Sequence, residues 1–305
     1  MTNMEQNGAG LEEVVCDLCG SAGRAVFFKE NGFFLVRCAQ CGLLYVNPRP
    51  AAGAVFEKFS HDYISYVDSY LSSRAIYERE AAARLDYLAR FTRPGRLLDV
   101  GCAVGTFLEL ARTRGWETAG VEPDAQLARH AVENLKLEVK VCDFEDNGYL
   151  DASFDVVTAH NILSHMRSPA RFFREAARLL KPGGYLILHT GNGAELSSRE
   201  EGEFLGEHWG TPDHLYHFAQ KHLETYFSES GLTVERIDRI PLLRLLFDKD
   251  NLLTFKGSKV KSVLKRLLVL LPPLRWAALA LVTVWAKARG RSGICKFVFA
   301  ARKNR

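Results

Sequence analysis

The segment 97–107, Leu-Leu-Asp-Val-Gly-Cys-Ala-Val-Gly-Thr-Phe, constrains the fold of this chain more than any other. Apolar residues and an acid lead into a short loop bounded by Gly101 and Gly105, and a helix-like run at 107–114 follows at once. Glycine tolerates the backbone angles of a sharp turn, so this order predicts a strand, a tight loop and a helix. In such an arrangement Gly105 lets the backbone pass close to a ligand, and the N–H groups that open the helix face a bound nucleotide.

Apolar runs bounded by turn residues continue this pattern along the chain. They predict strands at 116–121, 137–141, 154–159 and 185–190, and helices at 171–180 and 219–230. Glu122 follows the first of these strands, 21 positions after Gly101, where an acid in a doubly wound sheet reaches a ribose hydroxyl pair. Asp143 follows the next strand and His160 the one after it, and Gly183 is expected to end the first helix. Strands that alternate with helices predict an α/β fold.

The ordered set resembles the core of class I S-adenosylmethionine-dependent methyltransferases over roughly residues 90–240. The loop departs from a dinucleotide-binding GxGxxG motif, because Ala103 and Thr106 stand where glycines would be. The alternative for the loop alone is an ordinary strand-to-helix turn. The resemblance implies a Rossmann-like, seven-stranded sheet with helices on both faces, strands at 233–240 and 294–300, and an antiparallel last strand.

The resemblance also implies S-adenosylmethionine as the cofactor and assigns residues to it. Asp99, Gly101 and Gly105 are expected at its amino-acid end, Glu122 at the ribose, Asp143 and Phe144 at the adenine, and His160 on the methyl side. The full set of expected cofactor residues is Asp99, Gly101, Cys102, Ala103, Gly105, Glu122, Pro123, Asp143, Phe144 and His160.

Two Cys-x-x-Cys pairs near the N-terminus predict a metal site. The four cysteines are Cys16, Cys19, Cys38 and Cys41. Two such pairs at this separation are typical of a tetrahedral zinc site, with a hairpin around Asn31-Gly32 between them. Four unrelated free cysteines are the alternative. A module this small can hardly fold unaided, so we expect zinc to act mainly as a staple.

The decapeptide 41–50, Cys-Gly-Leu-Leu-Tyr-Val-Asn-Pro-Arg-Pro, resembles the zinc-ribbon leader of a bacterial methyltransferase group. That group includes deoxysugar C-methyltransferases and enzymes of surface-glycan and natural-product pathways. We therefore expect a zinc ribbon at 1–50, a helical linker or lid at 51–93, and a methyltransferase domain at 94–305.

The residues expected at the acceptor are histidines and tyrosines. Tyr63 and Tyr66 precede a helix and are expected to form a lid by resemblance, although packing is the alternative. His214 lies in an irregular run after the fifth strand, where such folds bind substrates, and can act as a general base. His165, and with less support His217, are further candidates. A loop histidine that only makes a structural hydrogen bond is the alternative for each.

The run 241–291 predicts a helical insertion before the last strand, because it is too long for a hairpin loop. It holds eleven Lys or Arg against two Asp, and its residues 267–286 form a largely apolar run that is broken by Pro272, Pro273 and Arg275. Paired prolines and a central Arg argue against a membrane span. Two short amphipathic helices at a membrane interface fit the pattern. A helical cap or a dimer surface is the alternative.

Composition sets the remaining expectations. Seven cysteines without an apolar leader predict a reducing cytoplasm, with contact at the inner face of the membrane if the insertion binds lipid. A net charge of +4 is too small to imply nucleic acid, so no nucleic-acid partner is expected. The predicted function is methyl transfer to a small molecule, a sugar or a lipid-linked glycan. An RNA methyltransferase and a non-catalytic cofactor-binding module are the alternatives, and the accepting atom is left open between O, N and C.

Overall fold

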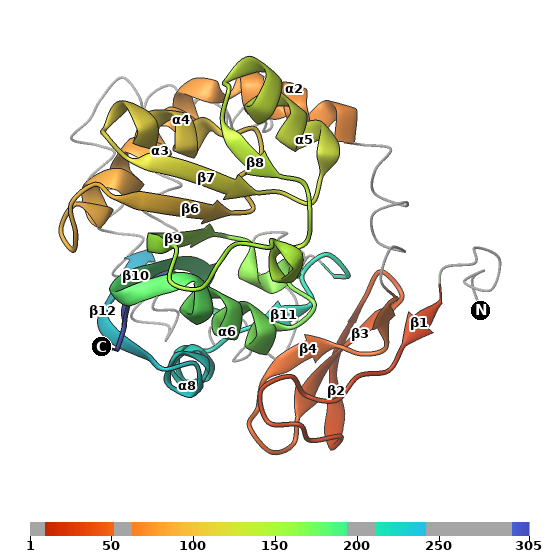
Figure 1. Ribbon diagram of the computed structural model, residues 1–305. Helices are drawn as coiled ribbons and strands as arrows, with labels where there is room; N and C mark the ends of the chain where they lie inside the picture. The colour runs from red at the N-terminus through yellow and green to blue at the C-terminus, as the bar shows by residue number, and fades with distance from the viewer. Residues whose placement is uncertain (1–9, 52–62, 194–210, 242–294, 305) are drawn as a thin grey trace, which may run out of the picture.

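The computed structural model describes residues 10–51, 63–193, 211–241 and 295–304 of the chain (Figure 1). A seven-stranded sheet forms its centre, with helices on both faces and a small antiparallel sheet at its side. The predicted α/β fold with an N-terminal four-cysteine module is confirmed. The division of the chain at residues 50 and 93 stays a prediction.

The central sheet follows the strand order β12-β13-β10-β9-β6-β7-β8. Its strands are β6 (Arg96–Val100), β7 (Glu117–Val121), β8 (Glu138–Lys140), β9 (Phe154–His160), β10 (Leu180–Gly191), β12 (Leu232–Pro241) and β13 (Cys295–Lys303). Only β13 runs against its neighbours, since it pairs antiparallel with both β10 and β12. The antiparallel last strand expected near 294–300 is therefore confirmed. The parallel strands β8, β7, β6, β9 and β10 all direct their carboxyl ends to one edge.

Helices cover both faces of this sheet (Figure 1). One face carries α3 (Arg74–Leu88) and α4 (Thr106–Thr113), and the other carries α6 (Pro169–Leu179) and α8 (Gln220–Glu229). The shorter elements are α2 (Tyr63–Ser72), α5 (Ala125–Arg129), the π-helical turn η2 (His130–Asn134) and the 3-10 turns η3 (Phe144–Asp146) and η4 (Leu163–His165). The helix α3 buries Ala81, Leu85 and Leu88, which recur at helical spacing in the sequence.

The prediction that Gly183 ends a helix is wrong. The helix α6 ends four residues earlier at Leu179, and Leu180 already pairs with Phe154 as the first residue of β10. Gly183, with φ of +81°, lies in the irregular stretch of β10 between Leu180 and Tyr185. Leu180 is already extended, because it pairs with Phe154, and Pro182 disfavours a return to helix at Lys181.

The N-terminal module is a small sheet built on the predicted hairpin. Strands β2 (Arg24–Glu30) and β3 (Phe33–Cys38) pair antiparallel around Asn31 and Gly32, whose φ values are +50° and +85°. Its other strands are β4 (Leu44–Val46) and β11 (Tyr216–His217), in the order β11-β4-β3-β2, and a separate pair joins β1 (Leu11–Glu12) to β5 (Arg49–Pro50). The strand β11 lies between β10 and β12 in the sequence, so the module is completed by a segment some 170 residues away.

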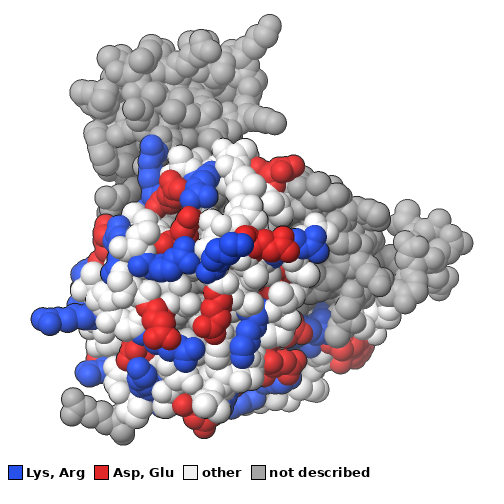
Figure 2. Space-filling model, turned by 45° about the horizontal axis from the view of Figure 1, so that its top comes forward, with Lys and Arg blue, Asp and Glu red and all other residues white. Residues whose placement is uncertain are grey.

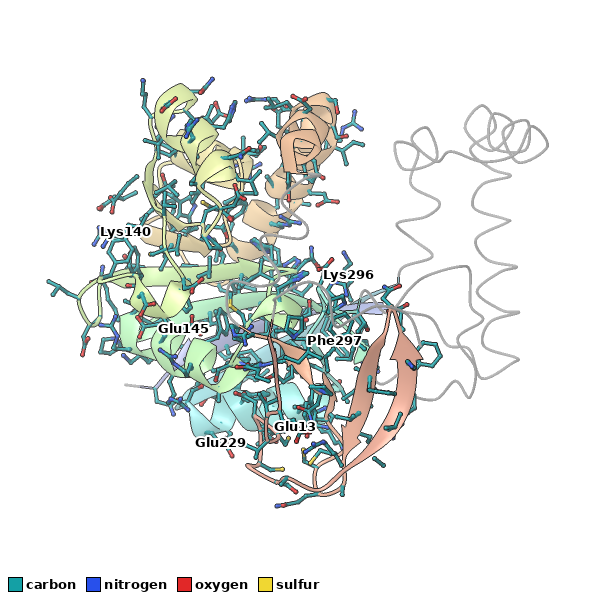
Figure 3. The ribbon with its side chains drawn as sticks, turned by 90° about the vertical axis from the view of Figure 1, so that its right-hand side faces the viewer. Glu13, Lys140, Glu145, Glu229, Lys296 and Phe297 are labelled. Carbon is teal, nitrogen blue, oxygen red and sulfur yellow. The ribbon has the colours of Figure 1, made fainter. Side chains whose placement is uncertain are left out.

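The module and the central sheet share one hydrophobic core. Leu35 and Val46 of the module belong to the same buried cluster as Phe173 of α6 and Tyr226 of α8. The view from the module's side shows its strands standing beside the sheet (Figure 3). Removing the module would expose these apolar groups to water, so it contributes to the stability of the whole chain.

Asp17 makes the polar part of this junction. It lies between the two cysteines of the first pair, and its Oδ2 accepts hydrogen bonds from Ala170 N at 2.8 Å and Tyr226 Oη at 2.9 Å. Its Oδ1 accepts from Ser168 Oγ at 2.7 Å. Ser168 is the N-cap of α6 and Pro169 has no N–H, so a carboxylate of the N-terminal module binds the first N–H group of that helix, that of Ala170.

Two predicted features lie outside the described residues. The insertion at 241–291 is one, apart from Pro241, and the side chains of Tyr63 and Tyr66 are the other. Among the helices that the structure describes, none combines the length and the apolar character that a membrane crossing requires. The membrane-contact and lid hypotheses therefore stay predictions.

Charged side chains are mixed on the face that carries α2, α4 and α5. On its described part, Lys and Arg alternate with Asp and Glu (Figure 2). Such a mixture provides no broad basic stripe for a nucleic-acid backbone on that part of the surface.

Candidate functional site

The loop after β6 has the geometry that its sequence predicts. Gly101, Ala103 and Gly105 adopt positive φ values of +71°, +48° and +84°. Gly101 N donates to Val121 O at 2.8 Å, which holds the loop against the end of β7. The helix α4 begins directly afterwards at Thr106. The N–H groups at the start of α4 therefore open at the carboxyl edge of the sheet.

Gly101 and Gly105 have protein neighbours that leave no room for a side chain. A Cβ on Gly101 would lie 2.6 Å from Cγ2 of Ile162. A Cβ on Gly105 would lie 2.7 Å from Cδ1 of Leu137 and 2.8 Å from Cβ of Ala131. Glycine is needed at position 105 because protein atoms already occupy the space that a side chain would fill. The expectation that Gly105 also lets the backbone approach a ligand stays a prediction.

Three acids lie at or just after the carboxyl ends of neighbouring strands. Asp99 is the penultimate residue of β6, Glu122 follows β7, and Asp143 lies shortly after β8. The order of these strands in the sheet is β6-β7-β8, so the acids stand in a row at its carboxyl edge. Asp99 and Glu122 are buried and Asp143 is exposed.

Glu122 is bound to the backbone of the loop. Its Oε2 accepts from Ala103 N at 2.9 Å, and its Oε1 accepts from Asp124 N at 3.0 Å. Burial raises the pKa of Glu122, while these two N–H groups act in the opposite direction. Each carboxylate oxygen has a second lone pair, so Glu122 can fix the loop and still accept a ligand hydroxyl.

Asp99 is held by a neighbouring strand. Thr158 Oγ1 donates to Asp99 Oδ1 at 2.7 Å, and His160 Nε2 lies 3.9 Å from the same oxygen. Burial raises the pKa of Asp99 to about 7, although the hydroxyl of Thr158 and the charge of Arg84 both lower it. A buried carboxylate of this kind is ready to pair with a positive group of a ligand.

His160 faces a second histidine that sequence reasoning did not identify. His160 and His189 are register partners on β9 and β10, and their ring centroids lie 4.6 Å apart. Burial lowers the pKa of both, to about 3 for His189, so both rings are neutral. Within the described chain, neither nitrogen of His160 has a hydrogen-bond partner, nor does Nε2 of His189. The sequence signal that could have identified His189 is its place at the end of a predicted strand, equivalent to the place of His160.

Arg84 is the second residue that sequence reasoning missed. It lies on α3 and donates to Glu80 Oε2 at 2.9 Å. It is close enough for its charge to lower the pKa values of Asp99, His160 and His189. The site therefore combines a buried acid, two neutral imidazoles and a nearby guanidinium. In the sequence, Arg84 is one charged residue among several on an amphipathic helix, so no pattern marks it.

The other expected cofactor residues serve the site through packing or backbone. The Sγ of Cys102 lies where a Cβ on Gly120 would approach to 2.7 Å, so the thiol packs against β7. Phe144 is 3% exposed and its ring packs against Phe172 at 5.3 Å. Pro123 is exposed at the entrance to α5. Of the pair Asp143 and Phe144, only Asp143 offers an exposed side chain.

Three histidines expected at the acceptor lie close together. The ring centroid of His214 lies 4.7 Å from that of His165 and 6.1 Å from that of His217. His165 belongs to η4, directly after β9, and Leu215 N donates to Ser164 O at 2.7 Å, which joins the two segments. The structure thus brings together two histidines, His165 and His214, that are 49 positions apart in the sequence.

The environment of His165 and His217 keeps both rings uncharged. Desolvation, and then the ring of His214, lower the pKa to about 4 for His165 and to about 3 for His217. The Nδ1 of His165 lies 3.0 Å from Asp213 O, so a neutral ring donates there and leaves Nε2 as an acceptor. An imidazole in this state can accept a hydrogen bond or a proton from an acceptor hydroxyl.

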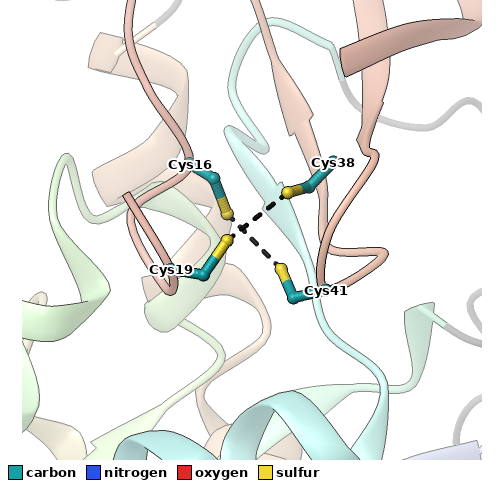
Figure 4. Close-up of side chains that lie close together, drawn as sticks. All are labelled: Cys16, Cys19, Cys38 and Cys41. Atoms are coloured by element: carbon teal, nitrogen blue, oxygen red, sulfur yellow. Dashed lines mark hydrogen bonds between the residues drawn. The ribbon is translucent and has the colours of Figure 1, made fainter. Parts of the chain in front are cut away.

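The four cysteines of the N-terminal module form a compact cluster (Figure 4). Their Sγ atoms lie within 4.8 Å of one another, with 3.5 Å between Cys16 and Cys41 and between Cys19 and Cys38. A Zn–S bond of about 2.3 Å places tetrahedral sulfurs about 3.8 Å apart, so the cluster fits a zinc ion.

Both halves of the cluster have the same local geometry. Gly20 N donates to Cys16 O at 2.8 Å and Gly42 N donates to Cys38 O at 3.0 Å, with positive φ at both glycines. Backbone N–H groups within each pair also stabilise the charged form of a thiolate; those of Cys41 and Gln40 lower the pKa of Cys38 to about 6 against the opposing effect of burial. The repeated turn and these donors are typical of a zinc knuckle.

Comparison with known proteins identifies the family. A family model described as "Methyltransferase domain" matches residues 73–237, and the chain belongs to this family. The fold and the ordered strands identify it as a class I S-adenosylmethionine-dependent methyltransferase domain, with an N-terminal four-cysteine cluster consistent with a zinc ribbon.

Curated relatives match the central part of the chain. The ubiquinone biosynthesis O-methyltransferase of Xanthomonas campestris pv. campestris is 37% identical over 117 residues, which cover 36% of this chain and 49% of that protein. An uncharacterised methyltransferase of Schizosaccharomyces pombe is 30% identical over 143 residues, which cover 41% of this chain and 50% of that protein. The chain spans about half the length of these relatives.

Solved structures share the fold. A methyltransferase of Archaeoglobus fulgidus that depends on S-adenosylmethionine has a TM-score of 0.52 at 17% identity, covering 79% of this chain and 99% of that chain. A chain in the complex between the Haloferax volcanii Trm112 methyltransferase activator and a methyltransferase has a TM-score of 0.53 at 16% identity, covering 78% and 97%. At these identities the likeness concerns the fold.

Proposed function

We propose that this protein transfers the methyl group of S-adenosylmethionine to a hydroxyl oxygen of a small molecule. The observation that carries the proposal is the sheet edge itself. The three acids at this edge and the Glu122-bound loop suit an adenosyl cofactor. His165 lies in η4, which follows the adjoining strand β9, and its ring contacts that of His214. The family supports the cofactor. Bound S-adenosylmethionine would supply an electrophilic methyl group.

The chain's own residues bind the two ends of the cofactor differently. Asp99 and the N–H groups that open α4 hold its amino-acid end, and Arg84 supplies the positive charge that a carboxylate needs. Glu122 accepts the ribose hydroxyls and Asp143 the adenine amino group. Positioning and exclusion of water account for most of the rate in this proposal.

His165 and His214 act on the acceptor. A hydroxyl must lose its proton as its oxygen attacks, and a neutral imidazole can take that proton. The free Nε2 acceptor of His165 beside the ring of His214 supports this role. The name of the Xanthomonas relative, an O-methyltransferase of ubiquinone biosynthesis, favours oxygen as the accepting atom.

A sugar or lipid-linked glycan hydroxyl is the second candidate acceptor. The likeness of residues 41–50 to the zinc-ribbon leader of sugar and glycan methyltransferases favours it. With either acceptor, zinc stabilises the fold of the ribbon. If the acceptor is lipid-linked, the insertion at 241–291 brings the protein to the inner face of the membrane.

A methyl-transfer assay tests the proposal. The purified protein is incubated with radiolabelled S-adenosylmethionine and three acceptor pools: phenolic small molecules, nucleotide and lipid-linked sugars, and bulk RNA. We expect label in one of the first two pools, and its loss in a His165→Asn, His214→Asn double variant. Label in RNA alone would replace the proposal with the RNA methyltransferase alternative. Binding of S-adenosylmethionine without label in any pool would favour the non-catalytic cofactor-binding module, and absence of binding would contradict the proposal.

A further inference from the structure

The zinc ribbon contacts the segment that carries the acceptor-side histidines. Strand β11 adds to the edge of the ribbon, with Tyr216 opposite Tyr45 and His217 opposite Leu44. Val46 N donates to Leu215 O at 2.9 Å and extends this pairing. The backbone on either side of Leu215 is thus set by the ribbon rather than by the central sheet.

The tip of the ribbon's hairpin holds the front end of the same segment. Asn31 Nδ2 donates to Thr211 O at 2.8 Å, and Thr211 N donates to Glu30 Oε2 at 2.9 Å. Thr211 is buried and lies three residues before His214. Both backbone groups of one residue are therefore satisfied by two adjacent ribbon side chains.

Arg49 holds the back end. Its Nη1 donates to Arg167 O at 2.6 Å and to Tyr216 Oη at 3.2 Å, and Tyr216 Oη donates to the same carbonyl at 3.2 Å. Its Nε pairs with Glu12 at 2.7 Å, and its side chain is 11% exposed. Arg167 and Tyr216 each lie two residues from one of the paired histidines, so one guanidinium joins both histidine segments.

We propose that the zinc ribbon positions the acceptor-binding histidines, with Arg49 as the principal positioning residue. The ribbon holds the segment 211–217 at both ends. It thereby supports the direct contacts of this segment with η4, from Leu215 N to Ser164 O and from His165 Nδ1 to Asp213 O, that place His214 beside His165. This inference rests on the proposed function for its catalytic meaning. Its structural content, the dependence of the His165–His214 contact on Arg49, is measurable without a substrate.

The test uses the full-length zinc-loaded protein and the nuclear Overhauser effect between the ring protons of His165 and His214. The unmodified protein should show this effect, since the ring centroids are 4.7 Å apart. In Arg49→Gln it should be lost, while the zinc content and the affinity for S-adenosylmethionine stay within about twofold of the unmodified protein. Arg24→Gln is the matched control, because Arg24 pairs with Glu13 within the ribbon, away from the histidines.

A second variant tests the same inference if Arg49→Gln does not fold. Tyr216→Phe keeps the ring but removes the hydroxyl that bridges Arg49 and Arg167 O, and it should weaken the same effect. An unchanged nuclear Overhauser effect in a zinc-loaded Arg49→Gln protein would overturn the inference. If Arg49→Gln is unfolded, an unchanged effect in Tyr216→Phe would do so. Absence of the effect in the unmodified protein would also overturn it. Failure to bind S-adenosylmethionine would instead count against the proposed function.

An activity readout follows once an acceptor is known. A displaced base should lower kcat by up to about 100-fold in Arg49→Gln while KM for S-adenosylmethionine stays constant. Equal changes in both parameters would indicate a general loss of structure and contradict the positioning role.

Discussion

Glu122 Oε2 accepts a hydrogen bond from Ala103 N at 2.9 Å, and this bond ties the end of β7 to the loop after β6. One carboxylate thereby shapes the loop and faces the same edge of the sheet as Asp99 and Asp143. The loop can be short of glycine because its unusual conformation at Ala103 is held from outside.

Replacing Glu122 should therefore weaken both the fold and the site. In Glu122→Gln the amide can accept only one of the two backbone N–H bonds that the carboxylate accepts. We expect a loss of about 1–3 kcal/mol in the free energy of unfolding. Urea denaturation measures it, with Glu117→Gln as the control, because Glu117 lies on β7, the strand that leads to Glu122, and has an exposed side chain. Equal stability of the two variants would contradict the bracing role.

Asp99 should make stability depend on pH. Its pKa in the fold is raised to about 7, so folding favours its protonated form. Its contribution to stability is therefore greatest in acid and is lost progressively as the pH rises from about 4 to about 7. Asp99→Asn removes this titration, so the variant should gain stability relative to the unmodified protein between pH 5 and pH 8. Denaturant midpoints at the two pH values measure the gain; a constant difference would show that the carboxyl does not titrate there.

Gly105 should not tolerate a side chain. Gly105→Ala combines a left-handed backbone with a Cβ 2.7 Å from Leu137, so we expect a loss of about 2–4 kcal/mol. Gly191→Ala is the control, since its Cβ would meet nothing within 4 Å and its φ is not in the left-handed region. Thermal unfolding of both variants tests this; an unshifted Tm in Gly105→Ala would contradict the packing described for the loop.

Zinc removal should destabilise the whole chain. The ribbon shares its apolar core with α6 and α8, and Asp17 binds the start of α6 from within the first cysteine pair. Treatment with a strong chelator, or Cys38→Ser, should remove about one zinc per chain and lower Tm by at least about 5 °C, which corresponds to about 2 kcal/mol. Cys142→Ser is the control, because this thiol lies outside the cluster. A Tm unaffected by metal loss would mean that the ribbon is not a staple.

The local signals of the sequence predicted the central sheet well. The glycine loop and the cysteine pairs depend on a few neighbouring residues, and each adopts the expected local form. The cofactor-binding roles of the acids at 99, 122 and 143 stay predictions. Gly183 failed as a helix end because strand pairing of Leu180 with Phe154 prevailed over the local turn signal.

The acceptor side could be predicted only in part. His165 and His214 were identified one by one, but their contact depends on β11 joining the ribbon, which is a long-range pairing without a local signature. His189 and Arg84 were missed because their roles arise from register and helix packing. Arg49 likewise acquires its partners only when the ribbon docks against η4.

Calorimetric titration with S-adenosylmethionine tests the central claim most directly: that the acids after β6, β7 and β8 bind one cofactor. We predict saturable one-to-one binding that is weakened at least about tenfold in each of Asp99→Asn, Glu122→Gln and Asp143→Asn, since each loses a charged hydrogen-bond acceptor of about 1.5–3 kcal/mol. Asp151→Asn, on the exposed acid that pairs with Arg178, should bind as the unmodified protein does. Absence of binding, or equal affinity in all four variants, would contradict the account.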